Sequence, residues 1–182
     1  AFITFFVVID PPGCAPIYAS LTKGANVAQR RNMALRAVMV ASGILLVFAL
    51  FGEQLLAALH IELNSFRIAG GIMLFLIAID MVFEKRTQRR EERAEKIAQT
   101  PEIEDVSVFP MAMPMIAGPG SIATMMLLTS RAKGTEETLV VLGALGAIML
   151  LTFGALAGAV PLMRLLGHRV EQVITRLLGV LL

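Results

Sequence analysis

Long apolar blocks separated by short polar stretches dominate the sequence. A bilayer core of about 30 Å needs roughly 20 apolar residues of helix to cross it. Four blocks meet this length: 33–52, 63–83, 106–130 and 138–163. The blocks at the two ends, 1–22 and 170–182, are expected to be the remainders of two further spans. The pattern therefore predicts an all-α integral membrane protein with six spanning helices.

Composition supports a membrane protein. Of the 182 residues, 57% are apolar and 16% are charged, and the mean hydropathy is +0.76. Soluble domains usually carry about 25% charged and 45–50% apolar residues. The excess of apolar residues excludes a water-soluble fold.

The charges are concentrated between the spans. Residues 84–105 hold six basic and seven acidic side chains, which is a mixed-sign linker and not a nucleic-acid-binding face. Eleven Lys and Arg residues lie in the loops after spans one, three and five, and two lie in the other loops. The positive-inside rule then places the linker and the odd-numbered loops in the cytoplasm.

An internal repeat relates the two halves of the chain. Two dipeptides recur at an offset of 107, and an Arg and a Gly recur at an offset of 109. The matched positions are Pro12-Gly13 with Pro119-Gly120, Leu21-Thr22 with Leu128-Thr129, Arg67 with Arg176, and Gly70 with Gly179. Each unit, 1–83 and 106–182, contains three spans. Because three is odd, the second unit is expected to be inverted relative to the first.

Both repeated units begin with a span rich in proline and glycine. Prolines around Gly13, and Pro114 and Pro119 around Gly120, are expected to break spans one and four near mid-membrane. Irregular backbone at that depth is tolerated only where it is buried in protein or lines a wet cavity. Interrupted spans at matching positions of two halves are the best sequence indication of a transporter binding site.

The breaks predict the chemistry of that site. Half-helices are expected to begin at Pro11 and Pro119, capped by Asp10 and Gly118, with both N-termini meeting near a pseudo-twofold axis. Unpaired N–H groups there favour a carboxylate, and freed carbonyls with Asp10 favour an ammonium. A small zwitterion satisfies both. The candidate substrate-binding residues are Asp10, Pro12, Gly13, Gly118, Pro119, Gly120, Ser121 and Thr124.

Each candidate also has a structural interpretation. Asp10 is either a helix cap or a contact for substrate or a proton, and the two roles can coexist. Gly13 and Gly120 either admit a ligand to the backbone or allow close helix packing. The hydroxyls of Ser121 and Thr124 either face the site or bond back to the preceding turn.

The repeated arginines have two interpretations as well. Arg67 and Arg176 either snorkel to the membrane interface or form an inward helix-packing or gating pair. Their recurrence in both halves, each followed by Gly three positions later, favours the inward pair.

Three segments in this order resemble the MarC family of bacterial and archaeal inner-membrane proteins. They are DPPGCAPIYASLT, SFRIAGGIMLFLIAIDM and PMAMPMIAGPGSIATMMLLTS. The resemblance covers nearly the whole chain. It implies six spans, an inner-membrane location and a small neutral amino-acid substrate such as alanine or glycine.

The function expected is therefore secondary transport of a small neutral amino acid, coupled to a proton or sodium gradient. The alternative is an exporter or channel for another small solute or ion. A thiol oxidoreductase is excluded, because the lone Cys14 has Ser121 as its repeat mate. No enzyme activity, cofactor or metal site is expected, since two His and one Cys cannot form a standard zinc site. A non-transporting scaffold leaves the paired breaks unexplained. The expected partners are the amino acid and lipid, without nucleic acid, and no oligomeric state is predicted.

Overall fold

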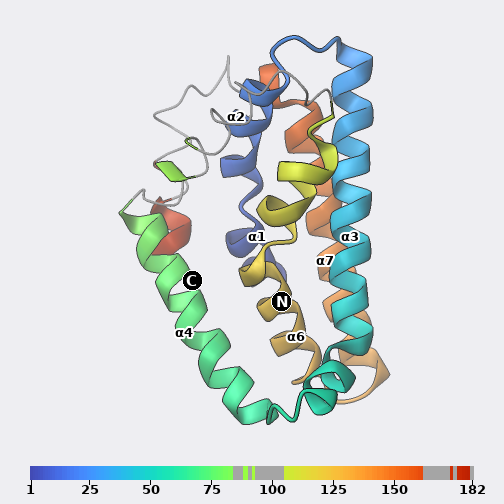
Figure 1. Cartoon of the computed structure of the whole chain (residues 1–182), viewed down its shortest axis with the longest axis vertical. Coiled ribbons are helices and arrows are strands. Elements are labelled where there is room, and N and C mark those ends of the chain that lie inside the picture. Colours follow the sequence, from blue (N-terminus) through green and yellow to red (C-terminus); the bar gives the residue numbers. More distant parts are fainter. Residues whose placement is uncertain (84–87, 90–91, 93–104, 162–172, 174–175, 181–182) are drawn as a thin grey trace.

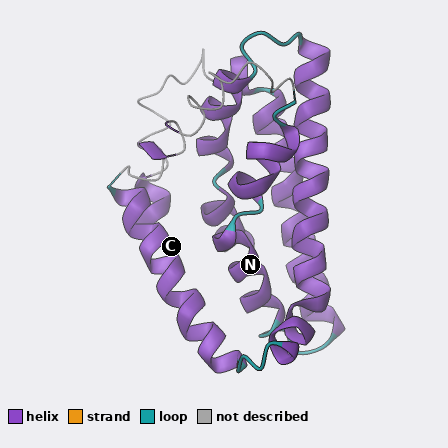
Figure 2. Cartoon of the chain, viewed as in Figure 1, coloured by secondary structure: helices purple, strands orange, loops and turns teal. Residues whose placement is uncertain are grey.

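The protein is helical throughout the part of the chain that the computed structural model describes. That part comprises residues 1–83, 88–89, 92, 105–161, 173 and 176–180. No strand occurs among these residues (Figures 1 and 2). The elements are α1 (Phe2–Ile9), α2 (Pro11–Leu21), α3 (Val27–Ala58), α4 (Leu63–Val82), the π-type segment η1 (Ser107–Ile116), α6 (Pro119–Thr129) and α7 (Thr135–Ala157).

Four helical stretches are long and apolar enough to cross a membrane, namely Phe2–Leu21, Val27–Ala58, Leu63–Val82 and Thr135–Ala157. The bent pair formed by η1 and α6 makes a fifth span if it is counted as one, with an angle of 53° between its halves. Each of the first five predicted blocks coincides with one of these stretches. The sixth block, 170–182, lies mostly outside the described residues. The all-α membrane class is therefore confirmed.

The helices run alternately along the long axis of the molecule (Figure 1). α1 and α2 run towards the upper end, α3 returns, and α4 rises again. η1 and α6 run downward and α7 rises beside α3. α3 contacts η1, α6 and α7, whereas α4 stands at the side and contacts the described bundle mainly through α6. The two broken spans therefore pack against α3 and α7, and one side of η1 stays exposed at Val108 and Phe109.

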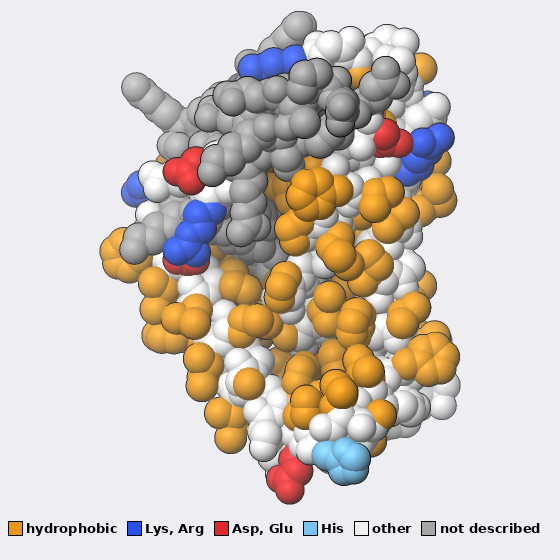
Figure 3. Space-filling model, in the orientation of Figure 1, with side chains coloured by type: hydrophobic (Ala, Val, Ile, Leu, Met, Phe, Trp, Pro, Cys, Tyr) orange, Lys and Arg blue, Asp and Glu red, His pale blue; other side chains and the backbone are white. Residues whose placement is uncertain are grey.

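Burial is confined to the faces that meet inside this bundle. Large side chains from several elements are fully enclosed there, including Phe5, Tyr18, Leu45, Met111 and Ile148. Many apolar side chains of α3, α4 and α7 point outward instead. Figure 3 shows a broad apolar surface across the middle of one face, with acidic and histidine side chains at its lower end. An apolar exterior of this extent suits a lipid environment and not water.

The first half of the fourth span, η1, is interrupted at two residues. Phe109 has φ −125° and ψ 126°, and Met113 has φ −132° and ψ 124°, so neither is helical. Each precedes a proline, and the proline ring disfavours helical geometry at the preceding residue. The sequence predicted a break at Pro114 but none at Pro110. The irregular backbone therefore begins earlier than expected.

Candidate functional site

The first span is interrupted at a single residue, Asp10. Its backbone is left-handed, with φ 57° and ψ 64°, so it ends α1 and begins α2. Its Oδ1 atom accepts a hydrogen bond from the Gly13 N–H at 3.1 Å, and the residue is 1% exposed. The predicted helix cap is confirmed. A carboxylate thus lies buried inside a spanning segment, where it is costly without polar contacts.

The N-terminus of α2 differs from the prediction. Pro11 and Pro12 have no N–H group, and the N–H of Gly13 is already bonded to Asp10. The expectation that both half-helices present unpaired N–H groups is therefore wrong for α2. A Cβ atom at Gly13 would lie 2.2 Å from Asp10 Oδ2, so the missing side chain makes room for this carboxylate.

The same prolines change the end of α1. Because Pro11 and Pro12 have no N–H group, neither can donate the hydrogen bond that a helical residue gives to the carbonyl four positions earlier. The Ile9 carbonyl accepts instead from Cys14 Sγ, 3.5 Å away. The carbonyl end of α1 and the Asp10 carboxylate therefore give this break negative character.

The second break lies at Ala117 and Gly118 and has the opposite character. Gly118 caps α6 with extended backbone, and no side-chain cap bonds to the N-terminus of this helix among the residues that the structure describes. A Cβ at Gly118 would lie 2.4 Å from the carbonyl oxygen of Pro114, so only glycine fits. The N–H groups of Gly120 and Ser121 begin α6 and carry its positive dipole end.

The two breaks lie next to each other. A Cβ at Gly120 would be 3.4 Å from Val8 Cγ1 on α1 and 2.5 Å from Ile77 Cδ1 on α4. From this level α2 runs to one end of the molecule and α6 to the other (Figure 1). Val8 and Ile77 could not be predicted as neighbours of the breaks, because nothing in the sequence distinguishes one apolar side chain of a span from another.

Two hydroxyls lie within the first turns of α6. Ser121 is 2% exposed and Thr124 is 1% exposed. Thr124 Oγ1 has no hydrogen-bond partner among the described residues, so the alternative in which it bonds back to the preceding turn is wrong. A buried hydroxyl without a partner is uncommon and needs an explanation.

Repeat-related threonines at the far ends of the two half-helices behave differently. The Thr22 hydroxyl donates to the carbonyl of Tyr18 at 2.7 Å. The Thr129 hydroxyl donates to the carbonyl of Met125 at 2.9 Å. Each hydroxyl thus bonds to the carbonyl four positions earlier in its own half-helix, although Thr22 follows the last residue of α2 and Thr129 is the last residue of α6.

The repeated arginines lie in different surroundings. Arg67 Nη2 on α4 donates to the backbone oxygen of Ser130 at the end of α6, 3.0 Å away. This contact joins two helices, but Arg67 is only partly buried, so the inward position expected of both arginines is not reached. Arg176 is exposed on the helical stretch 176–180. Its role in gating stays a prediction.

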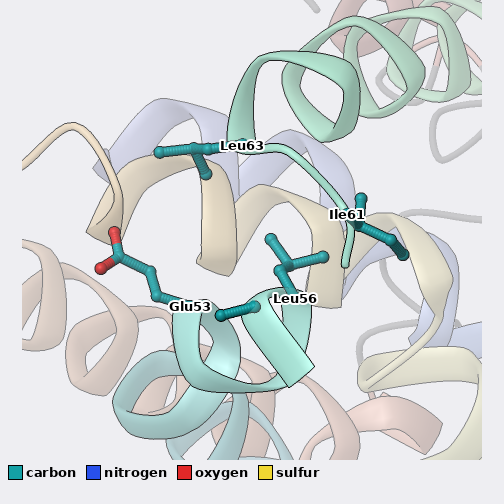
Figure 4. Close-up of a pocket in the computed structure, with 5 residues that line it drawn as sticks. Glu53, Leu56, Ile61 and Leu63 are labelled. Carbon is teal, nitrogen blue, oxygen red and sulfur yellow. The ribbon is translucent and has the colours of Figure 1, made fainter. Parts of the chain in front are cut away.

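A separate pocket lies at the turn between α3 and α4. Its lining is Glu53, Leu56, Ala57, Ile61 and Leu63. In Figure 4 the Glu53 carboxylate points away from Leu56 and Ile61. The pocket therefore has one acidic lining residue, and its other lining residues are apolar. None of the predicted site residues lines this pocket. Among the described residues, no group of three His, Cys, Asp or Glu side chains is placed to hold a metal ion.

Comparison with known proteins gives one family. The whole chain, residues 1–182, matches the family described as MarC family integral membrane protein. A UPF0056 membrane protein of Methanocaldococcus jannaschii is 34% identical over 182 residues, which is 100% of this chain and 88% of the relative. The UPF0056 membrane protein YvbG of Bacillus subtilis is 34% identical, with 100% and 86% covered. The UPF0056 inner membrane protein YhgN of Escherichia coli is 32% identical, with 100% and 88% covered. No solved structure matches the chain.

Proposed function

The chain belongs to the MarC family of integral membrane proteins, and we propose that it is a secondary transporter of a small neutral amino acid such as alanine or glycine. It acts in the plasma membrane of a bacterium or archaeon, in keeping with a relative named as an inner membrane protein. A proton or sodium gradient drives the movement. The proposal contains no catalytic step and no resident cofactor or metal.

One observation carries the proposal: the two interrupted spans adjoin at their breaks. The contact between the Gly120 position and Val8 brings the start of α6 to the end of α1. Breaks inside spanning helices cost hydrogen bonds that lipid cannot replace. Two such breaks at one place are the arrangement in which transporters bind their substrates.

The opposite characters of the two breaks suit a zwitterion. The substrate ammonium binds at Asp10 and the carbonyl end of α1, which are negative. The substrate carboxylate accepts hydrogen bonds from the N–H groups of Gly120 and Ser121, where the dipole of α6 is positive. The buried hydroxyl of Thr124 supplies a further donor on the same helix. In this arrangement the two half-helices are not equivalent: one supplies the acidic group and the other the donors.

The proposal includes six spans in two inverted units, 1–83 and 106–182, with the linker 84–105 in the cytoplasm. Two observations support inversion. α1 with α2 and η1 with α6 run in opposite directions (Figure 1). The Thr22 and Thr129 hydroxyls make the same bond at the ends of their half-helices. Inversion gives the protein two related states, open to opposite sides.

The test is transport by the purified full-length protein in liposomes. Uptake of labelled alanine and glycine is measured with an imposed proton gradient, a sodium gradient or neither, beside protein-free liposomes. We expect accumulation that depends on one gradient and disappears when an ionophore collapses it. Absence of flux for every small neutral amino acid would contradict the proposal and favour an exporter or channel for another small solute.

A further inference from the structure

α4 and α6 form an antiparallel pair with three contacts along its length. Arg67 bonds to the Ser130 carbonyl, and a Cβ at Gly70 would lie 3.0 Å from Leu127 Cδ1. At the other end, a Cβ at Gly120 would lie 2.5 Å from Ile77 Cδ1. Each helix therefore offers one glycine to an aliphatic side chain of the other. Small residues at such positions let membrane helices approach closely.

Only one of these contacts lies at the proposed binding site. Gly120 is the second residue of α6, so Ile77 reaches the turn whose N–H groups begin the helix. Leu127 and Gly70 meet nearer the other end of α6. In both contacts a glycine packs against an aliphatic side chain, but only the contact of Gly120 with Ile77 lies at the proposed binding site.

A second observation indicates that this end of α6 receives a polar ligand. Thr124 lies four positions after Gly120, so both residues are on the same face of the helix. The Cα–Cβ bond of a helical residue tilts towards the N-terminus, which directs the Thr124 hydroxyl to the same end. This hydroxyl is 1% exposed and has no partner in the described part of the chain.

We infer that Ile77 limits the size of the substrate side chain. This inference rests on the proposed function. A carboxylate bonded to the N–H groups of Gly120 and Ser121 brings the substrate Cα, and the side chain on it, to the first turn of α6. One side of that turn is closed by Ile77 and Val8, which are both apolar. Ile77 and Val8 therefore exclude substrates with branched side chains, which are too large, and substrates with charged side chains, which would lose their hydration there.

The experiment compares two variants of the full-length protein in liposomes. Ile77→Ala removes three carbon atoms beside the site. Leu127→Ala removes three carbon atoms from the glycine contact at the other end of the same helix pair. Initial uptake of labelled alanine, valine and leucine is measured for both variants and the parent.

We expect the valine-to-alanine ratio of uptake rates to rise about tenfold or more for Ile77→Ala, because each methylene in an apolar pocket changes discrimination by about 10–200-fold. Leu127→Ala should keep the parent's ratio. If Ile77→Ala does not give folded protein, Ile77→Val, which removes one carbon, should shift the ratio of 2-aminobutyrate to alanine in the same direction.

An unchanged valine-to-alanine ratio in the folded Ile77 variants, or an equal change of that ratio in Leu127→Ala, overturns the inference. Alanine uptake by the parent protein still supports the proposed function in that case. Absence of amino-acid uptake by the parent itself overturns both.

Discussion

Arg67 on α4 and Ser130 at the end of α6 are joined by a hydrogen bond of 3.0 Å from Nη2 to the backbone oxygen. The two residues are 63 positions apart. The last carbonyls of a helix have no partner within it and carry its negative dipole end. The guanidinium group of Arg67 on the neighbouring helix α4 therefore supplies a hydrogen-bond donor to the C-terminus of α6 and holds that end in place.

Replacing Arg67 by Gln should destabilise the protein. Hydrogen bonds to charged groups contribute about 1.5–3 kcal/mol, so we expect a lower midpoint of thermal unfolding in detergent. Arg131→Gln is the matched control, because Arg131 follows Ser130 directly and is exposed. Equal midpoints for the two variants would contradict a role of Arg67 in holding α6.

Asp10→Asn should separate the two roles of Asp10. Asn caps helices about as well as Asp and tolerates the left-handed conformation, so unfolding should begin at nearly the parental temperature. A neutral amide cannot pair with an ammonium, so stabilisation by added alanine should be lost. Asp10→Ala loses the cap as well, which typically costs about 1 kcal/mol. Parental stabilisation of Asp10→Asn by alanine would show that Asp10 is only a cap.

Gly13→Ala should displace the Asp10 carboxylate, since the new Cβ would lie 2.2 Å from Oδ2. We expect loss of the cap, a fall of about 1 kcal/mol in unfolding free energy, and weaker alanine binding. Gly43→Ala on α3 is the control, because no atom lies within 4 Å of its Cβ position. Ala there should be neutral or stabilising, by up to about 1 kcal/mol. If Gly13→Ala is as stable as Gly43→Ala, the Asp10 carboxylate can move without lowering the unfolding free energy, which would contradict this prediction.

The contacts of Asp105 just before η1 should make the stability of the protein depend on pH. The interaction of Asp105 with Ser107, followed by its ion pair with Arg36 at 2.9 Å, lowers the pKa of Asp105 below its ordinary value. A lowered pKa gives stability that is present above the ordinary value and is lost as the pH falls through the lowered one.

Asp105→Asn should therefore be less stable than the parent at pH 7, by under about 1 kcal/mol because the pair is exposed. The difference in thermal unfolding midpoint should shrink below about pH 4. Arg36→Gln should reproduce part of the effect. A difference that is constant between pH 7 and pH 3 would exclude this contact as its cause.

Single cysteines should report the sidedness of the loops. Cys14 is buried and is replaced by Ser. In that background, cysteine at the exposed position Arg31 should react with an impermeant reagent only from the cytoplasm. Cysteine at the exposed position Lys133 should react only from outside. Labelling of both positions from one side would contradict the inverted arrangement.

The sequence by itself determined the class of the protein and the points at which the two half-helices begin. Spans are set by the length of apolar blocks, which a helix converts directly into membrane depth. Asp10 caps its half-helix as predicted, because capping is decided by residues within one turn. Gly118 is the N-cap of α6 and Pro119 its first residue for the same local reason.

The tertiary structure decided what the two breaks present to each other. Sequence symmetry suggested two equivalent N-termini. The Asp10 carboxylate accepts the hydrogen bond of Gly13, the first residue of α2 that has an N–H group, whereas no side chain in the described part of the chain caps α6. The apolar neighbours of Gly120, Val8 on α1 and Ile77 on α4, lie 112 and 43 positions away in sequence. Periodicity places a side chain on a face of its own helix, but only packing between helices determines which partner that face meets.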